Sequence, residues 1–424
     1  MRRFFIALAV LALLAAGVLA GFLIHRIQQE KDVRGSSTKE FTPSTAPAPK
    51  PPPVTAKVQW PTYGFSATRT RSVDLPLAPP FRTLWKYGAG SLVEFPPAIG
   101  YGRLYFSTNA GRFAAISAKT GLRAWKRDLH RCVAASPAIG PHAHGTIYAA
   151  FLNRPPCNAL NGGHGNDGLV VAFSAGQGKI HWQRTIGPSE SSPLLIGDRL
   201  YVGDWNGDVW AFDADNGRQL WRRHVGGAIK GAVAFAGGHL YVGSYDGHLY
   251  CLTQGGKQVW RASGQPRLRG HGRFYSTPAL AYGRVYIGST DGKVYSFGAT
   301  SGKLIWSKST GGYVYASPAV WNDTIFAGSY SGDFFAFDAA TGDVRWKFDA
   351  HGRISGSATV IGNVVYFATL DGGKGRSKGR TFALNAHTGK PVWTFPDGKY
   401  TPVVAEKGRL FLIGYGTVYG MVPR

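Results

Sequence analysis

A tryptophan-terminated unit of about 40 residues recurs along this chain and constrains its fold more than any other feature. Two of the units run from Leu200 to Trp221 and from Ile325 to Trp346, with apolar, glycine and acidic positions in the same order. The unit closes at Trp85, Trp125, Trp182, Trp221, Trp260, Trp306, Trp346 and Trp393. The spacings are 40, 57, 39, 39, 46, 40 and 47 residues, so three units carry insertions. Repeats of this period are typical of solenoids and propellers.

Each unit holds four short β runs separated by turn signals. Pairs such as Asn206-Gly207 and Asp246-Gly247 supply the positive φ values that a two-residue hairpin needs. The runs are apolar on both faces, which indicates sheets that are buried on both sides. Four buried strands at a period near 40 residues predict a β-propeller.

The two ends of the repeat predict how the ring closes. After Trp393 only three β runs remain, and the missing fourth run is Phe81 to Tyr87, which precedes the first complete unit. We therefore expect an all-β, eight-bladed β-propeller with four antiparallel strands per blade, in which the two chain ends complete one blade. Pairing of the two ends also hides sheet edges.

One sequence pattern within the repeat is specific enough to compare with known families. It reads Ala211-x-Asp213-x-x-x-Gly217-x-x-x-Trp221 and returns from Ala336 to Trp346. This pattern resembles the tryptophan-docking repeat of quinoprotein dehydrogenases and their PQQ-like propeller relatives, which include the propeller lipoprotein of the outer-membrane protein assembly complex. The resemblance covers residues 60–424 and implies the eight-bladed fold. It implies little about activity, because one fold hosts many functions.

The resemblance also implies what a quinone enzyme of this kind would need: an adjacent cysteine pair over the cofactor, Ca²⁺ ligands and an aspartate base. The cysteines here, Cys132, Cys157 and Cys251, are not adjacent, and the chain has no Cys-x-x-Cys-His haem site. We therefore predict no catalytic residue, no metal site and no resident cofactor. PQQ with Ca²⁺ is expected only if the chain is a quinone-dependent oxidoreductase.

The chain divides into three predicted regions. Residues 1–35 are expected to form a membrane anchor with its flanks, residues 36–58 a Pro-rich tether, and residues 59–424 the propeller. The anchor is the uncharged apolar run from Phe4 to Ile24, which as a helix would be roughly 31 Å long and would cross a hydrocarbon core.

The flanks of the apolar run predict its orientation. Arg2 and Arg3 favour a cytoplasmic N-terminus, which places the propeller on the extracytoplasmic side of a single-pass protein of the cell membrane. Alternatively, the run is a signal peptide that is cleaved after Ala20, which would leave a secreted or periplasmic propeller.

One position of each repeat is predicted to face a central funnel, because the first strands of a propeller line its axis. Taken three residues before the proline of each first strand, or ten before the leucine of the second, these positions are Glu94, Ala134, Glu190, Lys230, Tyr275, Tyr315, Ser355 and either Lys399 or Tyr400. Carboxylates, an amine and phenols at one mouth could hold a polar ligand. The candidate ligand-binding residues are therefore Glu94, Glu190, Lys230, Tyr275, Tyr315, Ser355 and Tyr400. The alternative is a hydrated mouth in which glutamate and lysine neutralise each other.

The cysteines lie at three distinct places in the repeat. Cys132 precedes a first strand, and Cys157 lies in the insertion between a second and a third strand. Up-and-down topology puts both loops on one face, so an extracytoplasmic disulfide between them is expected. Cys251 stands within a third strand and is expected to be a buried thiol.

The chain is strongly basic, with 48 Lys and Arg against 23 Asp and Glu and a formal net charge of +25. Loops after the tryptophan strands and loops between second and third strands are predicted to share one face. The basic residues on this face are Lys126, Arg127, Arg131, Arg222, Arg223, Arg261, Arg267, Arg269, Arg273, Arg353, Lys374, Arg376, Lys378 and Arg380. Such a face would meet an envelope protein or an anionic envelope surface. Nucleic acid is disfavoured by the expected location, and a solvated face without a partner is the alternative.

These features favour a membrane-tethered extracytoplasmic propeller, monomeric, that acts as a non-catalytic binding or scaffold module in cell-envelope assembly. Two other functions stay open at this point. One is a PQQ- or other quinone-dependent oxidoreductase, and the other is a sensor domain that binds a small ligand in the funnel.

Overall fold

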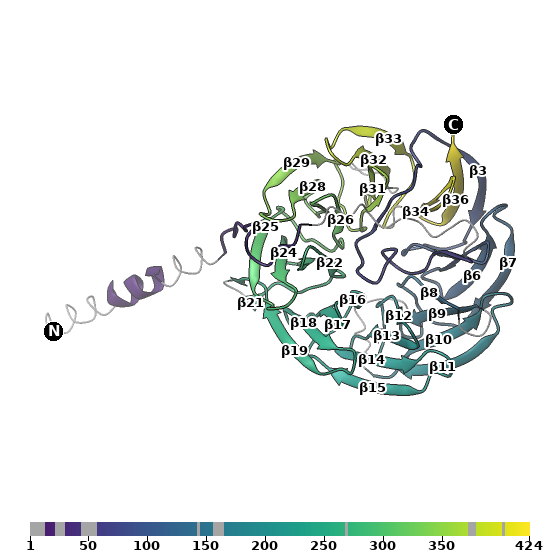
Figure 1. Cartoon of the computed structure of the whole chain (residues 1–424), viewed down its shortest axis with the longest axis horizontal. Coiled ribbons are helices and arrows are strands. Elements are labelled where there is room, and N and C mark those ends of the chain that lie inside the picture. Colours follow the sequence, from purple (N-terminus) through teal and green to yellow (C-terminus); the bar gives the residue numbers. More distant parts are fainter. Residues whose placement is uncertain are drawn as a thin grey trace, which may run out of the picture.

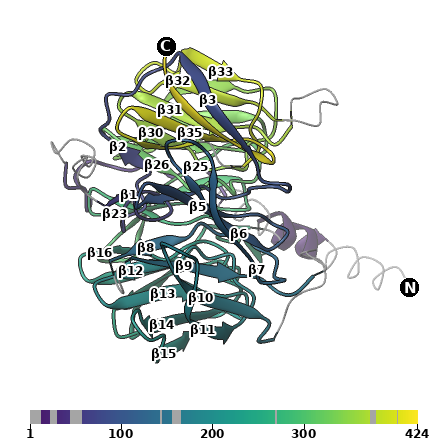
Figure 2. The same ribbon diagram turned by 90° about the vertical axis from the view of Figure 1, so that its right-hand side faces the viewer.

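The computed structural model describes residues 13–21, 30–43, 57–141, 145–155, 165–267, 270–371, 379–400 and 403–424. Within these residues, eight four-stranded antiparallel units surround one axis as the blades of a propeller (Figure 1). The strands of a blade follow one another outward from the axis, as β12 to β15 do in the side view of Figure 2. The predicted all-β, eight-bladed fold is confirmed.

Blades 1 to 4 are built in chain order from four consecutive strands each. Their bounds are β4 (Ala98–Gly100), β5 (Arg103–Ser107), β6 (Arg112–Ser117) and β7 (Arg123–Asp128); β8 (Ala138–Gly140), β9 (Thr146–Phe151), β10 (Gly168–Ser174) and β11 (Ile180–Ile186); β12 (Leu194–Ile196), β13 (Arg199–Gly203), β14 (Asp208–Asp213) and β15 (Gln219–His224); and β16 (Ala234–Ala236), β17 (His239–Gly243), β18 (His248–Thr253) and β19 (Gln258–Ser263).

Blades 5 to 7 repeat this order, after a small hairpin of β20 (Pro266–Arg267) and β21 (Gly270–His271). Their bounds are β22 (Ala279–Ala281), β23 (Arg284–Gly288), β24 (Lys293–Gly298) and β25 (Leu304–Ser309); β26 (Ala319–Trp321), β27 (Thr324–Gly328), β28 (Asp333–Asp338) and β29 (Val344–Asp349); and β30 (Thr359–Ile361), β31 (Val364–Ala368), β32 (Thr381–Asn385) and β33 (Pro391–Phe395).

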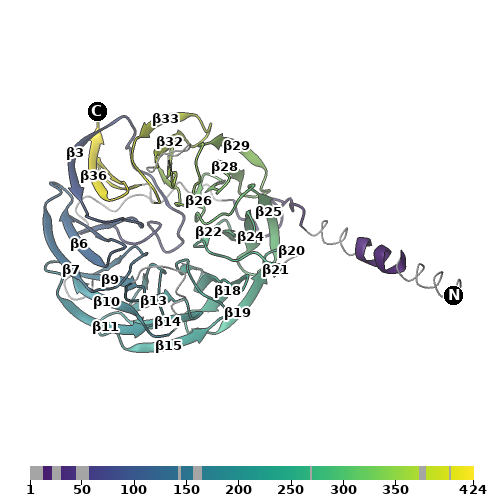
Figure 3. The same ribbon diagram turned by 180° about the vertical axis from the view of Figure 1, so that it is seen from behind.

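Blade 8 contains both ends of the propeller sequence. Its inner strands are β34 (Val403–Glu406), β35 (Arg409–Ile413) and β36 (Thr417–Pro423), and its outer strand is β3 (Phe81–Gly88). β3 pairs antiparallel with β36, with Phe81 opposite Pro423 and Gly88 opposite Thr417. Both strands lie side by side in Figures 1 and 3, which confirms the predicted closure.

The repeated tryptophan joins each blade to the next one. The Trp182 indole Nε1 donates a hydrogen bond to the carbonyl oxygen of Ala214 in the following blade, at 2.9 Å. Its ring covers Gly217, which has a φ of +70° and no room for a Cβ atom. Equivalent hydrogen bonds run from Trp125, Trp221, Trp260, Trp306 and Trp346 to the next blade. The sequence pattern therefore encodes a contact between blades.

A segment before the first complete blade crosses one end of the central axis. This crossing segment, residues 58–73, begins with β1 (Val58–Trp60) beside β4 and ends with β2 (Ser72–Val73) beside β30. In between, its carbonyl oxygens accept hydrogen bonds from the first-strand amides of Ile139, Phe235, Leu280, Val320 and Val360. It is the dark chain near the centre of Figure 1. The crossing segment therefore closes this end of the funnel.

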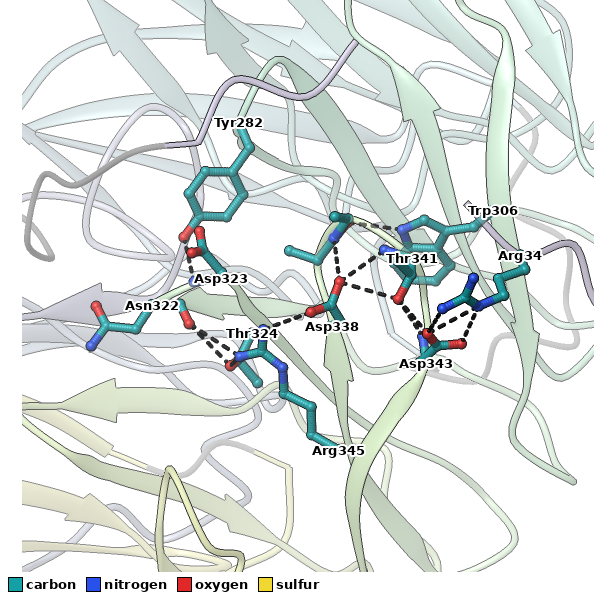
Figure 4. Close-up of polar contacts among 12 residues, drawn as sticks. Arg34, Tyr282, Trp306, Asn322, Asp323, Thr324, Asp338, Thr341, Asp343 and Arg345 are labelled. Carbon is teal, nitrogen blue, oxygen red and sulfur yellow. Dashed lines mark hydrogen bonds and ion pairs between the residues drawn. The ribbon is translucent and has the colours of Figure 1, made fainter. Parts of the chain in front are cut away.

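A second N-terminal segment, residues 30–42, lies on blades 5 and 6. Val33 forms an isolated antiparallel bridge with Ser307 of β25, and Arg34 pairs with Asp343 at 2.6 Å (Figure 4). The buried Arg284 guanidinium donates to the carbonyl oxygens of Ser36 and Lys39, at 2.6 and 2.7 Å. The structure differs here from the expected tether, because the first residues of the predicted range 36–58 are fixed to a blade.

The predicted membrane anchor falls largely outside the described residues. Residues 13–21 are helical. In the described part of the chain, no helix is long and apolar enough to cross a membrane.

Candidate functional site

A cavity of about 420 Å³ occupies the centre of the propeller. Its floor includes Tyr63 and Arg71 of the crossing segment, and its wall comes from the loops that precede the first strands. The repeat position chosen from the sequence lines this cavity in every blade, as Glu94, Ala134, Glu190, Lys230, Tyr275, Tyr315, Ser355 and Tyr400. The structure thus brings these residues together, and their binding of a ligand stays a prediction.

An ion pair inside the cavity matches Lys230 with Glu190. The Lys230 Nζ lies 3.6 Å from Glu190 Oε2, and both side chains are mostly buried. The same ammonium lies 3.8 Å from the ring centre of Trp205 and 5.4 Å from that of Tyr245, which is cation–π geometry. Burial raises the pKa of Glu190, and the charge of Lys230 opposes this shift. Lys230 therefore keeps a buried carboxylate and two aromatic rings in place.

Glu94 lies in the same cavity, where Glu190, Lys230 and Lys399 act on it electrostatically. Burial first, and then the charge of Glu190, raise the pKa of Glu94 to about 8, while Lys230 and Lys399 lower it. At neutral pH this carboxyl group is therefore mostly protonated and can donate a hydrogen bond. The cavity thus offers a carboxylic acid next to the Glu190–Lys230 pair.

Tyrosine rings cover one side of the cavity. The ring centres of Tyr275 and Tyr315 lie 4.8 Å apart, and those of Tyr315 and Tyr330 lie 4.9 Å apart, both in edge-on geometry. Burial raises the pKa of Tyr275 far above its ordinary value, and it also raises that of Tyr315. These phenols are therefore neutral at physiological pH and act as hydrogen-bond donors and stacking surfaces.

The crossing segment supplies the floor of the cavity with polar groups. The Tyr63 hydroxyl lies 2.8 Å from the Ser357 hydroxyl, and the Arg71 guanidinium lies 4.3 Å from the Tyr63 ring centre. Beneath it, Arg69 is fully buried and donates to the carbonyl oxygens of Tyr63 and Val233. Burial lowers the pKa of Arg69 to about 9. Backbone carbonyls therefore hold two arginines under the site.

Sequence reasoning missed five of the residues that shape this cavity: Tyr63, Arg71, Trp205, Tyr245 and Tyr330. The last three share one repeat position, directly after the Gly-Asp or Gly-Ser pair whose glycine ends the second strand. The sequence repeat was therefore sufficient to predict this second cavity-lining position. Tyr63 and Arg71 lie before the first complete unit, so no repeat position points to them.

The basic residues predicted on one face have varied surroundings. Arg127 donates to the carbonyl oxygens of Gln177 and Gly178 in the next blade, and Arg131 is largely buried near Asp167, at 3.3 Å. The exposed members of the set are Lys126, Arg222, Arg223, Arg261, Arg267, Arg273, Arg353 and Arg380. Arg269, Lys374, Arg376 and Lys378 lie outside the described residues. Their joint role as a binding face stays a prediction.

The structure describes only part of what was predicted for the three cysteines. Cys251 is a free, buried cysteine, as expected. Cys157 lies outside the described residues, so its pairing with Cys132 stays a prediction.

The groups in the cavity do not fit a quinone tricarboxylate with Ca²⁺. The Lys230 side chain of the cavity is already paired with Glu190, and the Arg71 side chain lies against the Tyr63 ring. Neither cation is free to pair with a carboxylate of the quinone. Among the side chains that the structure describes, no group of three or more His, Cys, Asp or Glu could hold a metal ion. The cavity is therefore suited to hydrogen bonding and stacking, and we derive no redox step from it.

Comparison with known proteins identifies the family. The family model described as "Outer membrane protein assembly factor BamB" matches residues 166–313 and 299–419, which together span more than half of the chain. This chain belongs to that family. The PQQ-like relationship that the tryptophan pattern predicted is therefore confirmed.

Individual relatives are distant and match only in part. BamB of Burkholderia pseudomallei is 30% identical over 129 residues, which are 30% of this chain and 32% of that protein. Tetrathionate hydrolase of Acidithiobacillus ferrooxidans is 24% identical over 181 residues, which are 39% of this chain and 36% of that protein. The alignments thus span about a third of the length of these relatives.

Solved structures share the fold. BamB of Moraxella catarrhalis superposes with a TM-score of 0.61 and 18% identity, covering 81% of this chain and 98% of that one. Quinohemoprotein alcohol dehydrogenase of Comamonas testosteroni superposes with a TM-score of 0.69 and 17% identity, covering 86% and 80%. An outer-membrane protein assembly factor and a dehydrogenase thus have the same architecture, so the fold alone does not choose between their functions.

Proposed function

We propose that this chain is a non-catalytic binding module of the cell envelope that takes part in outer-membrane protein assembly. The observation that carries this proposal is the match of the BamB family model to the blades from β10 to β36. A propeller of eight interlocked blades is a rigid disc with a large surface, which suits a scaffold that holds other proteins.

The chemistry of the cavity supports a binding role over a catalytic one. An adjacent cysteine pair and a haem motif are absent from the sequence, and the lysine of the cavity is neutralised by Glu190. The tyrosines have raised pKa values, so they are poor general bases at neutral pH. Stacking, hydrogen bonding and charge remain as the means of recognition.

The proposal includes a location on the extracytoplasmic side. The apolar run from Phe4 to Ile24 would attach the chain to the cell membrane or direct its export. The attachment of residues 30–42 to blades 5 and 6 would then leave only residues 25–29 between the run and the propeller. Five residues span at most about 18 Å, so the disc would stay close to the membrane surface.

A deletion experiment tests the proposed function. In a bacterium that encodes this chain, loss of the gene is expected to lower the amount of folded outer-membrane β-barrel proteins, seen as loss of their heat-modifiable mobility in gels. The wild-type gene should restore the amount. Unchanged β-barrel levels, together with no co-purification with the assembly machinery, would refute the proposal.

The cavity favours a second candidate function, the binding of a small polar ligand. Its volume and its mixture of carboxyl, phenol and ammonium groups are those of a ligand pocket. A bound ligand would raise the melting temperature. A ligand that binds the wild type but binds equally well to Glu190→Ala and Tyr315→Ala would exclude this cavity as its binding site.

The alternative of a quinone-dependent oxidoreductase predicts dye reduction after addition of PQQ and Ca²⁺.

A further inference from the structure

Aromatic and cationic side chains alternate along the mouth of the central cavity. The mouth arc, as we call it, crosses blades 6, 7 and 8 and consists of Tyr313, Tyr330, Arg353, Tyr400, Lys399 and Tyr415. In its first half, the ring centres of Tyr313 and Tyr330 lie 6.2 Å apart, and the Arg353 guanidinium lies 5.8 Å from the Tyr330 ring centre. Tyr400 in the second half interacts electrostatically with Tyr330 and Arg353, so the two halves are neighbours.

The other half of the mouth arc has the same composition. The Lys399 ammonium lies 4.9 Å from the ring centre of Tyr415 and 5.9 Å from that of Tyr400. Tyr400 lines the cavity, so the arc borders the opening directly. Such cation–π contacts hold the charged groups in place before any partner arrives, which reduces the entropy lost on binding.

Two tyrosines of the arc are unusually exposed. Tyr313 is 52% exposed and Tyr415 is 47% exposed, although most large apolar side chains of the described propeller are buried. Exposed tyrosines flanked by arginine or lysine have the composition of protein-binding hot spots. The two rings mark the ends of the arc.

The mouth carries both carboxylates and cations, and Asp397 accepts a hydrogen bond from the Tyr415 amide at 3.1 Å. Arg353 has a partner in Asp371, at 3.0 Å, but among the described residues neither Lys399 nor Arg273 has a carboxylate at ion-pair distance. Arg273 precedes the first strand of blade 5 and lies 5.4 Å from the Tyr245 ring centre. Glu190 is neutralised by Lys230 within the cavity. An approaching anionic group would therefore be attracted to the mouth.

We propose that the mouth arc is a docking surface for an acidic, extended segment of a partner protein. Its carboxylates would pair with Lys399 and Arg273, and its apolar side chains would pack on Tyr313 and Tyr415. The inference rests on the proposed function as a binding module and names the chemistry of its partner. A protein is favoured over a lipid surface because the arc borders a concave opening, which a flat membrane cannot enter.

A peptide with defined charge tests the proposal on the full-length protein. The probe is a fluorescein-labelled 12-residue peptide of alternating Glu and Leu, and its control has Gln in place of every Glu. Binding is measured by fluorescence anisotropy at 50 and 300 mM salt. We expect the Glu peptide to bind about tenfold more tightly than the Gln peptide at low salt, with the difference reduced at high salt.

Matched variants locate the binding. The double variant Tyr313→Ala, Tyr415→Ala should lower the affinity for the Glu peptide by about tenfold. Val259→Ala combined with Val392→Ala is the control, because these two side chains are each 48% exposed on the outer strands β19 and β33. Lys399→Gln should also weaken binding, whereas Lys257→Gln, in a turn at the opposite end of its blade, should not.

Three results would overturn the inference. The first is equal affinity for the Glu and Gln peptides, and the second is an equal loss of peptide affinity in the mouth variants and the control variants. The third is tighter binding to anionic vesicles than to the Glu peptide, with the same dependence on Tyr313 and Tyr415. Failure of the docking inference is distinguishable from failure of the proposed function. If gene deletion lowers β-barrel levels while mouth variants complement fully, only the docking surface is wrong. If the peptide binds at the mouth but deletion has no effect, the assembly role is wrong.

Discussion

The contact between each tryptophan and the glycine of the next blade makes a sharp prediction about stability. A Cβ atom at Gly217 would lie 2.5 Å from Trp182 Cδ2, and the ring is fixed by its hydrogen bond to Ala214. Gly197 has a similar φ of +59°, but a Cβ atom there would meet nothing within 4 Å. The pair Gly217→Ala and Gly197→Ala therefore separates steric overlap from backbone strain.

The expected magnitudes follow from these two positions. Alanine at positive φ destabilises the folded state by roughly 1–2 kcal/mol. The lower conformational entropy of the unfolded chain offsets about 0.4–1 kcal/mol of this loss. Gly197→Ala should therefore lower the free energy of unfolding by about 1 kcal/mol or less. Gly217→Ala adds overpacking of about 1–3 kcal/mol, so we expect an excess of about 2 kcal/mol. For a propeller of about 370 residues this excess lowers Tm by roughly 2–3 °C.

Calorimetry on the two variants and the wild type measures this difference. In a Trp182→Leu background the clash is removed, so both alanine substitutions should then cost the same. Equal Tm values for Gly217→Ala and Gly197→Ala with Trp182 present would refute the reasoning, since the ring contact would then carry no penalty.

Three further predictions concern other parts of the molecule. Because the folded pKa of Glu94 lies above its unfolded value of 4.5, stability should fall as pH rises from about 4.5 to 8, and Glu94→Gln should flatten that part of a Tm-against-pH curve. Gly35→Val should release residues 30–42, since a Cβ atom there meets Ala340 O at 2.5 Å; limited proteolysis should then cut this segment while Tm changes little. Deletion of β3 should lower Tm by far more than either change, because blade 8 then exposes the edge of β36 to water.

The sequence repeat predicted those cavity residues that occur once in every blade. A single repeat position supplies eight side chains around the axis, because equivalent positions of equivalent blades point to the same centre. The same logic extends to Trp205, Tyr245 and Tyr330, which form a second column next to the first. Periodicity is therefore enough to find the wall of the cavity.

Periodicity could not predict the segments that occur once. Tyr63 and Arg71 reach the cavity floor only because residues 58–73 hydrogen-bond across several first strands. Residues 30–42 find their place through partners such as Arg284 and Asp343, which are more than 240 positions away in sequence. Such pairings depend on tertiary structure, and an Arg or Asp in a loop gives no local sign of them.

The crossing segment has a consequence for both candidate binding functions. Because residues 58–73 close one end of the axis, the cavity is reached through the mouth that Tyr400 borders. A small ligand must therefore pass the mouth arc, and a partner segment docked on Tyr313 and Tyr415 would cover the same opening. A docked partner would therefore slow the entry and release of a ligand held by Glu190 and Tyr315. A cavity that was open at both ends would leave a second route for the ligand.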